Sequence, residues 1–304
     1  PIVIDGTTVC PKLLSKSETV SRRDIAKEAR NARIGLLCRR ASSAGTTGSP
    51  LIFPQPLSAL QAEQAFIDHL WCTKGYYQNA KVAVMRGRTG FRGISKFYNR
   101  LVISAMGWDD KDIKLKYDAL CSFKPEFIDC YPSILERFLR RCYALGLSEF
   151  PHVKAVFAGS EDCLDIQEHL FKSSLGGALT VSWYGQSEQV ALGLKVSSNT
   201  FHFLTSYSEL AFIESGQVLE IVGRSKLNPF FSQFWYRTGD YCDSAIAAYS
   251  DLLKSPVVEI KGLAGRQPEN IVTCDGNLVP LNHIIFGLHD ENWYSVERYC
   301  FVQE

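Results

Sequence analysis

Three features that would assign a protein to a class at once are missing from this sequence. Charges of the two signs nearly cancel, with 33 Lys and Arg against 32 Asp and Glu, so charge gives no case for binding nucleic acid or an anionic membrane. No uninterrupted apolar run is long enough to span a bilayer, and the N-terminus lacks the basic-then-apolar pattern of an export signal. We therefore expect a cytoplasmic protein with no membrane and no nucleic-acid partner.

Paired cysteines are also missing. The sequence has ten cysteines, but none form a C-x-x-C pair, so a zinc ribbon or a dithiol redox motif is unsupported. They are scattered along the chain at Cys10, Cys38, Cys72, Cys121, Cys130, Cys142, Cys163, Cys242, Cys274 and Cys300. Many lie among apolar neighbours, where cysteine behaves as a small hydrophobe. Without an export signal we expect reduced, buried thiols, and a disulfide framework is the alternative.

The sequence does contain enough apolar residues for a large core, since 46% of its 304 residues are hydrophobic. Short β-branched or aromatic runs predict buried strands at Lys81–Met85, Leu101–Met106, Val153–Ala158 and Leu179–Trp183. Apolar residues at helical spacing predict a helix over Pro132–Gly146, with a capping box of Ser133 and Glu136. A second helix is predicted to begin at Asp165, with Glu168 three residues on. A third is predicted to begin at Ser58, with Gln61 completing its capping box. Strands and helices that alternate in this way predict an α/β fold with a largely covered sheet.

The pattern changes after about Thr200. Residues 201–223, FHFLTSYSELAFIESGQVLEIVG, predict successive strands with a turn at Ser215–Gly216. We therefore expect an antiparallel section added to the α/β part. The sequence contains no internal repeat and no low-complexity segment.

The stretch ASSAGTTGSP, residues 41–50, contains only small, hydroxyl-bearing and glycine residues before its proline. It lies between two extended-looking stretches, which predicts a loop that joins two strands. No lysine follows Gly48, so the loop is not an ordinary P-loop. Gly45 and Gly48 would let backbone N–H groups approach an anion, and Thr46 and Thr47 would add hydroxyl donors. A flexible hairpin loop explains the same residues equally well.

The stretch VSWYGQSEQVALG combines an aromatic residue, a glycine, a hydroxyl and a carboxylate. Its strand is expected to end at Trp183, after which Tyr184 and Gly185 turn the chain. Ser187 and Glu188 would then project from the carboxyl end of the strand, where ligands collect in open α/β sheets. Such a set can stack a base, approach a phosphate and hold a metal. The alternative is that Glu188 is a solvated residue at a helix start.

Two later stretches offer groups for a ribose. In FWYRTGDYCD, Asp240 follows Thr238 and Gly239, and a carboxylate there can take both ribose hydroxyls; an Asp in an ordinary turn is the alternative. In IKGLAGRQPENIVTCDGNLVPLNHI, Arg266 could fork to a ribose or phosphate, or form a surface ion pair. The dipeptide Asp275–Gly276 in the same segment predicts a tight hairpin.

Taken in order, SAGTTGSP, YGQSE, YRTGD and a G-R-x-x-E segment followed by a D-G hairpin resemble the adenylate-forming superfamily of acyl- and aryl-CoA ligases. Within it, the chain looks most like the phenylacetate–CoA ligase branch and its capsule-biosynthesis relatives. The marks of that branch are TTGSPLIF, with Leu51 where many ligases have Lys, together with DCYPSIL (Asp129–Leu135), GSED (Gly159–Asp162) and SKLNPFF. The resemblance runs from about Pro11 to the last residue, at the level of motifs.

The resemblance implies the layered α/β core of an enzyme that activates a carboxylic acid with ATP and Mg²⁺ to an acyl-adenylate and passes it to a thiol such as coenzyme A. It implies catalytic roles for Thr46, Thr47 and Glu188, with Glu188 on Mg²⁺. At the β- and γ-phosphates it implies Ser43, Gly45 and Gly48 with the two threonines, and by the α-phosphate it implies Ser187. Around the adenine it implies Gly159, Ser160, Glu161, Trp183 and Tyr184 with the adjoining Gly185. At the ribose it implies Asp240 and Arg266. Such chemistry needs positioning and charge neutralisation more than covalent help.

The sequence departs from the family pattern in three places. Ala44 replaces the second hydroxyl residue usual in the phosphate loop, which should weaken phosphate contacts by about one net hydrogen bond. Glu269 replaces the usual Asp, a milder change. The family carries a C-terminal lid with a lysine that reaches the α-phosphate, whereas Lys261 is the last lysine here.

We therefore expect residues 1–264 to form the nucleotide- and carboxylate-binding core and 265–304 to form a hinge and the start of a truncated lid. Truncation is favoured because the sequence begins with Pro1 and not Met. The acid should bind near Trp183, the GSED loop and the helix after Ser58. The alternative is a non-catalytic relative that binds nucleotide or acyl-adenylate without the lid lysine, for example in polysaccharide biosynthesis.

Overall fold

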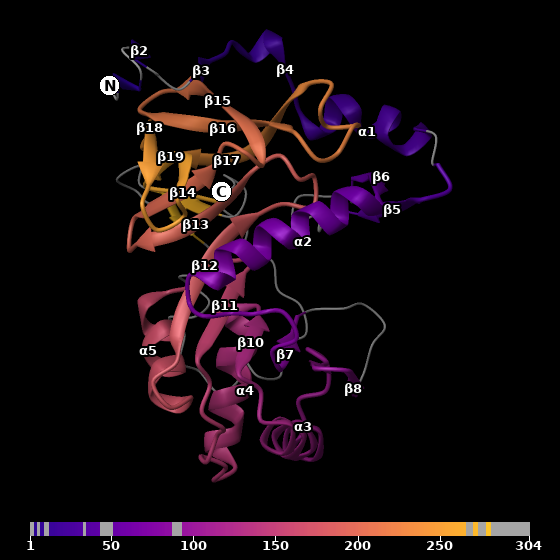
Figure 1. The fold of residues 1–304 in the computed structure, drawn as a ribbon, viewed down its shortest axis with the longest axis vertical. Helices are drawn as coiled ribbons and strands as arrows, with labels where there is room; N and C mark the ends of the chain where they lie inside the picture. Colours follow the sequence, from indigo (N-terminus) through magenta and orange to yellow (C-terminus); the bar gives the residue numbers. More distant parts are fainter. Residues whose placement is uncertain are drawn as a thin grey trace.

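The computed structural model of the chain describes residues 12–32, 35–42, 51–86 and 93–265, together with the backbone of residues 3–4, 7–8, 270–272 and 278–280. Its helices are α1 (Arg22–Asn31), α2 (Leu57–Cys72), α3 (Asp110–Phe123), α4 (Pro132–Ala144) and α5 (Asp165–Ser174), with a short 3-10 turn, η1 (Lys16–Glu18). Figure 1 shows α3, α4 and α5 at one end of the molecule and the antiparallel strands at the other.

One ten-stranded sheet runs through the molecule in the order β18-β19-β14-β13-β12-β11-β10-β7-β9-β8. Its strands are β7 (Val82–Met85), β8 (Ile94–Phe97), β9 (Arg100–Ile103), β10 (Phe127–Cys130), β11 (Ala155–Gly159), β12 (Leu179–Gly185), β13 (Leu192–Ser197), β14 (Thr200–Leu204), β18 (Ser244–Ser250) and β19 (Ser255–Lys261). Strands β9, β7, β10, β11 and β12 are parallel, and pairing becomes antiparallel from β13 onward. The junction between the two halves is therefore β12, which carries YGQSE at its end.

A second sheet of five strands has the order β3-β15-β16-β17-β4. Its strands are β3 (Lys12–Leu13), β4 (Thr19–Val20), β15 (Ser208–Ser215), β16 (Val218–Ser225) and β17 (Trp235–Cys242). Three further antiparallel pairs are β1 (Val3–Ile4) with β2 (Thr7–Thr8), β5 (Cys38–Ser42) with β6 (Ile52–Pro56), and β20 (Asn270–Val272) with β21 (Leu278–Pro280). The β5–β6 pair confirms that residues 41–50 connect two strands.

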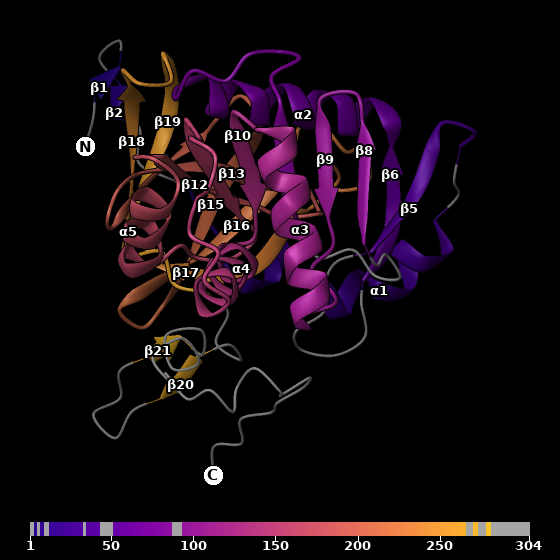
Figure 2. The same cartoon turned by 90° about the horizontal axis from the view of Figure 1, so that it is seen from below.

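Strands β10 and β11, at the centre of the parallel part, are buried at every position and therefore on both faces. Ala83, Ile128 and Val156 belong to the core cluster that α3, α4 and α5 complete. Phe127 and Phe157, one residue away along their strands, belong to the cluster that α2 completes. Figure 2 shows α2 on one side of these strands and the other three helices on the opposite side. Successive side chains of a strand point to opposite faces, so each helix layer has its own apolar surface to cover.

The predicted α/β class is confirmed, and the four predicted strands correspond to β7, β9, β11 and β12. The antiparallel section is also present, but it belongs to two sheets. Strands β13, β14, β19 and β18 continue the large sheet, whereas β15, β16 and β17 form the core of the second one. The turn at Gly216 adopts a positive φ of 64°, as the hairpin between β15 and β16 requires. The residues of the predicted Asp275–Gly276 turn lie outside the described part.

The predicted capping boxes of two helices are wrong. Helix α4 begins at Pro132, whose fixed φ suits a first helical position, and Ser133 is not its cap. The N–H of Ser133 instead donates to Glu161 at 2.6 Å, and Glu136 accepts from Arg140 at 2.7 Å. Helix α2 begins one residue earlier than predicted and has no side-chain cap. Tertiary partners therefore replace the local caps that the sequence suggested.

The cysteines of the described part are free thiols, namely Cys38, Cys72, Cys121, Cys130, Cys142, Cys163 and Cys242, and the last four are buried in apolar clusters. This agrees with the expectation of reduced thiols for these positions. Among the helices that the structure describes, none is long and apolar enough to cross a membrane.

Candidate functional site

Residues of the predicted GSED and YGQSE stretches lie at the carboxyl ends of parallel strands, together with Arg86 and Asp129. Arg86 follows β7, Asp129 lies near the end of β10, Gly159 ends β11 and Gly185 ends β12. In parallel sheets these ends share one edge, which is where ligands bind in open α/β folds. The topology therefore brings the GSED and YGQSE stretches together, as the sequence analysis expected.

The indole of Trp183 packs closely against two glycines, Gly159 at the end of β11 and Gly185 at the end of β12. A Cβ atom added at Gly159 would be 2.5 Å from Cε2 of Trp183, and one added at Gly185 would be 2.6 Å from its Cζ3. Both glycines are needed here because any larger residue would push the ring away. Gly159, which was predicted to frame an adenine, is thus in contact with the indole of Trp183. Trp183 is 9% exposed.

The sequence analysis missed an ion pair whose cation lies over this indole. The guanidinium of Arg86 lies 5.3 Å from the Trp183 ring centroid and donates from Nε to Asp129 Oδ1 at 2.8 Å. Burial raises the pKa of Asp129, and the Arg86 charge opposes that shift. The signal for Arg86 was its place directly after the VAVM strand. The pair presents a held cation beside an aromatic face, an arrangement that stabilises both groups.

The next two residues of the GSED stretch have different surroundings. Ser160 is exposed and adopts a φ of 70°. Glu161 turns back toward α4 and accepts the N–H of Ser133, and burial raises the pKa of its carboxyl. Its carboxylate lies at the positive end of the α4 helix dipole, a favourable place for negative charge. Glu161 therefore stabilises the start of α4 in addition to any contact with a ligand.

Asp240 is the residue at which the two sheets meet. Its Oδ2 accepts from the hydroxyl of Tyr184 at 2.5 Å and from Nε2 of Gln186 at 2.7 Å, and Gln186 also donates to the Tyr184 oxygen at 2.6 Å. Tyr184 lies on β12 of the large sheet and Gln186 directly follows that strand, whereas Asp240 lies on β17 of the small sheet. Asp240 is 7% exposed. Gln186 was not among the predicted site residues, although the YGQSE motif contains it.

A β-bulge aims Asp240 at this cluster. Arg237 pairs with Val222 and Tyr241 pairs with Glu220, so three residues of β17 oppose one residue of β16. Inside the bulge Gly239 has a φ of 79°, and the Thr238 hydroxyl both donates to the Ile221 carbonyl at 2.8 Å and accepts from Asp240 N at 3.0 Å. Bulges of this kind redirect side chains near functional sites. Asp240 is therefore part of a strand and not of an exposed turn.

The turn after β12 is held from several directions. Gln189 N donates to the Gln186 carbonyl at 3.0 Å, which closes the turn, and Gln189 has a φ of 60°. Glu188 is 2% exposed and accepts from the Tyr236 hydroxyl at 3.1 Å. Glu188 is therefore a buried side chain and not the solvated helix-start residue that was the alternative. Ser187, which lies between Gln186 and Glu188 in the sequence, is exposed.

Glu63 of α2 fixes the far side of the same turn. Its carboxylate accepts from Nε2 of Gln189 at 2.9 Å and from the Tyr207 hydroxyl at 2.8 Å. Burial raises the pKa of Glu63, and the two hydrogen bonds oppose that shift. Sequence reasoning missed Glu63, because nothing local distinguishes it from other polar residues of an amphipathic helix.

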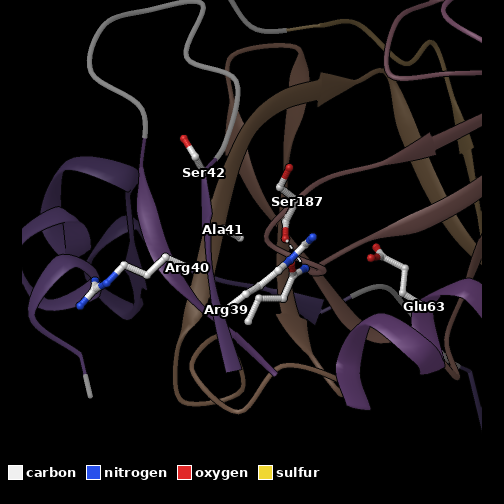
Figure 3. A pocket seen from close by; sticks show the side chains of 7 residues that line it. Arg39, Arg40, Ala41, Ser42, Glu63 and Ser187 are labelled. Atoms are coloured by element: carbon white, nitrogen blue, oxygen red, sulfur yellow. Dashed lines mark hydrogen bonds between the residues drawn. The ribbon is translucent and has the colours of Figure 1, made fainter. Parts of the chain in front are cut away.

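A cavity of about 300 Å³ lies between the β5–β6 hairpin and this turn, and Arg39, Ser42, Gln55, Glu63 and Ser187 contribute to its lining. Figure 3 shows Ser42 at the end of β5 on one side and Glu63 on α2 on the other. The predicted loop residues Ser43, Gly45, Thr46, Thr47 and Gly48 lie outside the described part, as do Arg266 and Glu269. The residues on both sides of the loop, Ser42 and Leu51, are described, and Ser42 lines the cavity.

The residues present fit Mg²⁺ only in one way. Among the described residues, no group of three or more His, Cys, Asp or Glu side chains is placed to hold a metal. Mg²⁺ is commonly held by one or two carboxylates together with substrate phosphates and water. Glu188 could supply one carboxylate oxygen of such a set, with the remaining ligands coming from a bound nucleotide.

Comparison with known proteins gives the fold. No protein-family model matches the chain, and no curated protein matches it in sequence. In contrast, 2-hydroxyisobutyryl-CoA ligase in the postadenylation state in complex with 2-HIB-AMP is similar over 89% of this chain, with a TM-score of 0.65 and 14% identity. The fold is that of the N-terminal core of adenylate-forming enzymes.

Two further solved structures are similar to this chain in fold. An open conformation of 2-hydroxyisobutyryl-CoA ligase in complex with 2-HIB-AMP and CoA matches 89% of the chain at 12% identity and a TM-score of 0.62. The acyl acid amido synthetase AtGH3.15 in complex with 2,4-DB matches 88% of the chain at 14% identity and a TM-score of 0.54. The chain covers 63% to 65% of the length of these proteins. At such identities the likeness speaks for the fold alone.

Proposed function

We propose that this chain is the nucleotide- and carboxylate-binding core of an enzyme that activates a carboxylic acid with ATP to an acyl-adenylate and passes the acyl group to a thiol such as coenzyme A. The observation that carries the proposal is the contact of Tyr184 and Gln186 with Asp240. It unites two motifs that are far apart in the sequence, at the edge of the sheet where nucleotides bind in α/β folds.

The proposal assigns each residue of the site a role. Asp240 would accept the ribose hydroxyls, with Arg266 assisting, and Tyr184 would lie along the base. Gly159, Ser160, Glu161, Trp183 and Gly185 would frame the adenine. Ser187, which is exposed at the cavity, would donate to the α-phosphate. Thr46 and Thr47, with Ser43, Gly45 and Gly48, would hold the β- and γ-phosphates.

In the proposed reaction, a carboxylate oxygen of the acid attacks the α-phosphorus, and the bond from that phosphorus to the oxygen of the β-phosphate breaks as pyrophosphate leaves. The residues of the chain position the two reactants and offset negative charge; none forms a covalent bond. Bound Mg²⁺, with Glu188 as a ligand, would supply further charge neutralisation. A second thiol-directed step would then release adenosine monophosphate.

The finer assignments belong to the same proposal. The marks TTGSPLIF, DCYPSIL and SKLNPFF favour the phenylacetate–CoA ligase branch. Residues 1–264 would form the binding core and 265–304 the hinge and the start of a lid. A cytoplasmic location belongs to the same proposal.

The experiment is binding and exchange on the same protein sample. Titration calorimetry with adenosine monophosphate and ATP measures the nucleotide site, and pyrophosphate exchange with a panel of aryl and medium-length carboxylic acids, supported by hydroxamate trapping, measures activation. Binding together with acid-dependent exchange is expected. Nucleotide binding without exchange for any acid would favour the non-catalytic relative, and neither binding nor exchange would contradict the nucleotide site itself.

A further inference from the structure

The cavity beside Ser187 has a cation directed into it that no motif identified. In Figure 3 the side chain of Arg39 extends from β5 toward Ser187, whereas that of Arg40 extends the opposite way. Arg40 also contributes to the lining of the cavity, but its Nη1 donates to the Arg30 carbonyl at 2.7 Å. Neighbouring side chains of a strand point to opposite faces, and the guanidinium that extends toward Ser187 is that of Arg39.

A neutral group holds Arg39 in place. Its Nε and Nη2 both donate to Oε1 of Gln55, at 3.0 and 2.8 Å. Gln55 is 2% exposed, and its amide nitrogen donates in turn to the Ser187 carbonyl at 3.4 Å. Of the ion pairs within residues 12–265 that the structure describes, none includes Arg39. The guanidinium therefore keeps its full charge and most of its five donors for a ligand.

The phosphate loop needs a cation from elsewhere. Leu51 stands where many of the ligases that the sequence resembles have Lys, and it is 2% exposed in a cluster with Phe53 and Phe231. An apolar residue buried in this way contributes no charge to a phosphate. Arg39 extends into the cavity from β5, the strand that leads into the predicted phosphate loop. Ser42, the last residue of β5, also lines the cavity.

Glu63 faces the same cavity and would repel an anion if it were fully charged and free. Its two carboxylate oxygens already accept from Tyr207 and Gln189. Burial raises the pKa of Glu63, which reduces its repulsion of an anion, whereas its two hydrogen bonds and the charge of Arg39 oppose that shift.

We propose, building on the function proposed above, that Arg39 binds the pyrophosphate portion of ATP and neutralises the charge that develops on it as it leaves, with Gln55 holding the guanidinium in the cavity. A planar guanidinium can donate two parallel hydrogen bonds to a phosphate, which a lysine in the loop could not do. When the bond between the α-phosphorus and its bridging oxygen breaks, the electron pair stays on the pyrophosphate oxygen. A cation placed there stabilises the charge as it forms.

The test compares Arg39→Ala with Arg40→Ala, a neighbouring change of the same kind whose side chain points away. Calorimetry on the purified chain with ATP, inorganic pyrophosphate and adenosine monophosphate separates the two ends of the nucleotide. We expect Arg39→Ala to weaken ATP and pyrophosphate binding by roughly 10- to 100-fold, since charge-assisted hydrogen bonds are lost. Binding of adenosine monophosphate should be unchanged, Arg39→Lys should restore part of the affinity, and Arg40→Ala should match the unaltered chain.

The outcomes separate this inference from the proposed function. Equal loss of ATP and pyrophosphate affinity in Arg39→Ala and Arg40→Ala, or no loss in either, would overturn the role of Arg39 while leaving the nucleotide site standing. Pyrophosphate binding that depends on Arg39 in a chain that does not bind adenosine monophosphate would support the anion site and contradict the proposed function. A chain that binds none of the three ligands would overturn both.

Discussion

The hydroxyl of Tyr184 donates to Oδ2 of Asp240 at 2.5 Å, and this contact joins the ten-stranded sheet to the five-stranded one. Gln186 reinforces it by donating to the same oxygen. Both sides of the contact belong to motifs that the sequence analysis assigned to a nucleotide, so the site and the packing of the two sheets share the same residues. Changes here should therefore affect stability and ligand binding together.

Replacing Asp240 with Ala removes the acceptor shared by Tyr184 and Gln186. We expect the free energy of unfolding to fall by about 1–3 kcal/mol, because a charged acceptor in a buried cluster is lost, and affinity for adenosine monophosphate to fall at least tenfold. Urea unfolding and calorimetry measure the two effects, with Glu214→Ala as a control on an exposed residue of the same sheet. A destabilised variant that still binds adenosine monophosphate normally would restrict Asp240 to a structural role.

Replacing Gly159 with Ala tests the close packing of the Trp183 indole on Gly159. The new Cβ would meet the ring at 2.5 Å, so the ring or the strands must shift. We expect a loss of about 1–3 kcal/mol in the free energy of unfolding, typical of overpacking, and weaker nucleotide binding. Gly35→Ala is the matched control, since no atom lies within 4 Å of a Cβ there. If the two variants unfold at the same urea concentration, the close packing of Trp183 on Gly159 is wrong.

Replacing Glu188 with Gln tests the metal assignment. The amide keeps an oxygen that can accept from Tyr236, so we expect the free energy of unfolding to change by less than about 1 kcal/mol. Mg²⁺-dependent ATP binding should be abolished, because the charged ligand is gone. Titration of ATP with and without Mg²⁺ measures this. ATP binding with an unaltered response to Mg²⁺ would mean that Glu188 does not hold the metal.

The buried thiols should resist alkylation over a wide pH range. Burial raises the pKa of Cys142 and of Cys242 to about 12, so at pH 8 only about one thiol in 10⁴ is ionised at each. Exposed Cys72 should react with iodoacetamide first, and the labelling of Cys142 should rise as pH approaches 12. Peptide mass spectrometry follows each site, and urea-unfolded protein provides full labelling. Equal rates for Cys72 and Cys142 in the folded protein would contradict the burial of Cys142.

Sequence reasoning found elements whose pattern is local and strong. The runs of β7 and β11 are apolar from end to end, and helix α4 has a regular apolar face. It missed α3, although Asp109 caps that helix by accepting from Asp112 N at 2.9 Å. It also missed α1 and β10. These elements are short or mixed in composition, and packing against the sheet supplies what their sequences lack.

The sequence by itself determined the α/β class and the four polar stretches, because hydrophobic period, glycine placement and residue type are properties of neighbouring residues. Tertiary structure alone decided that Asp240 faces Tyr184 and Gln186 from a bulge, that Glu161 stabilises the start of α4, and that Arg39 enters the cavity beside Ser187. Each of these depends on strand register and on contacts between residues far apart in the chain. One residue of shift in a strand sends its side chains to the opposite face, and no local pattern records which face meets the ligand.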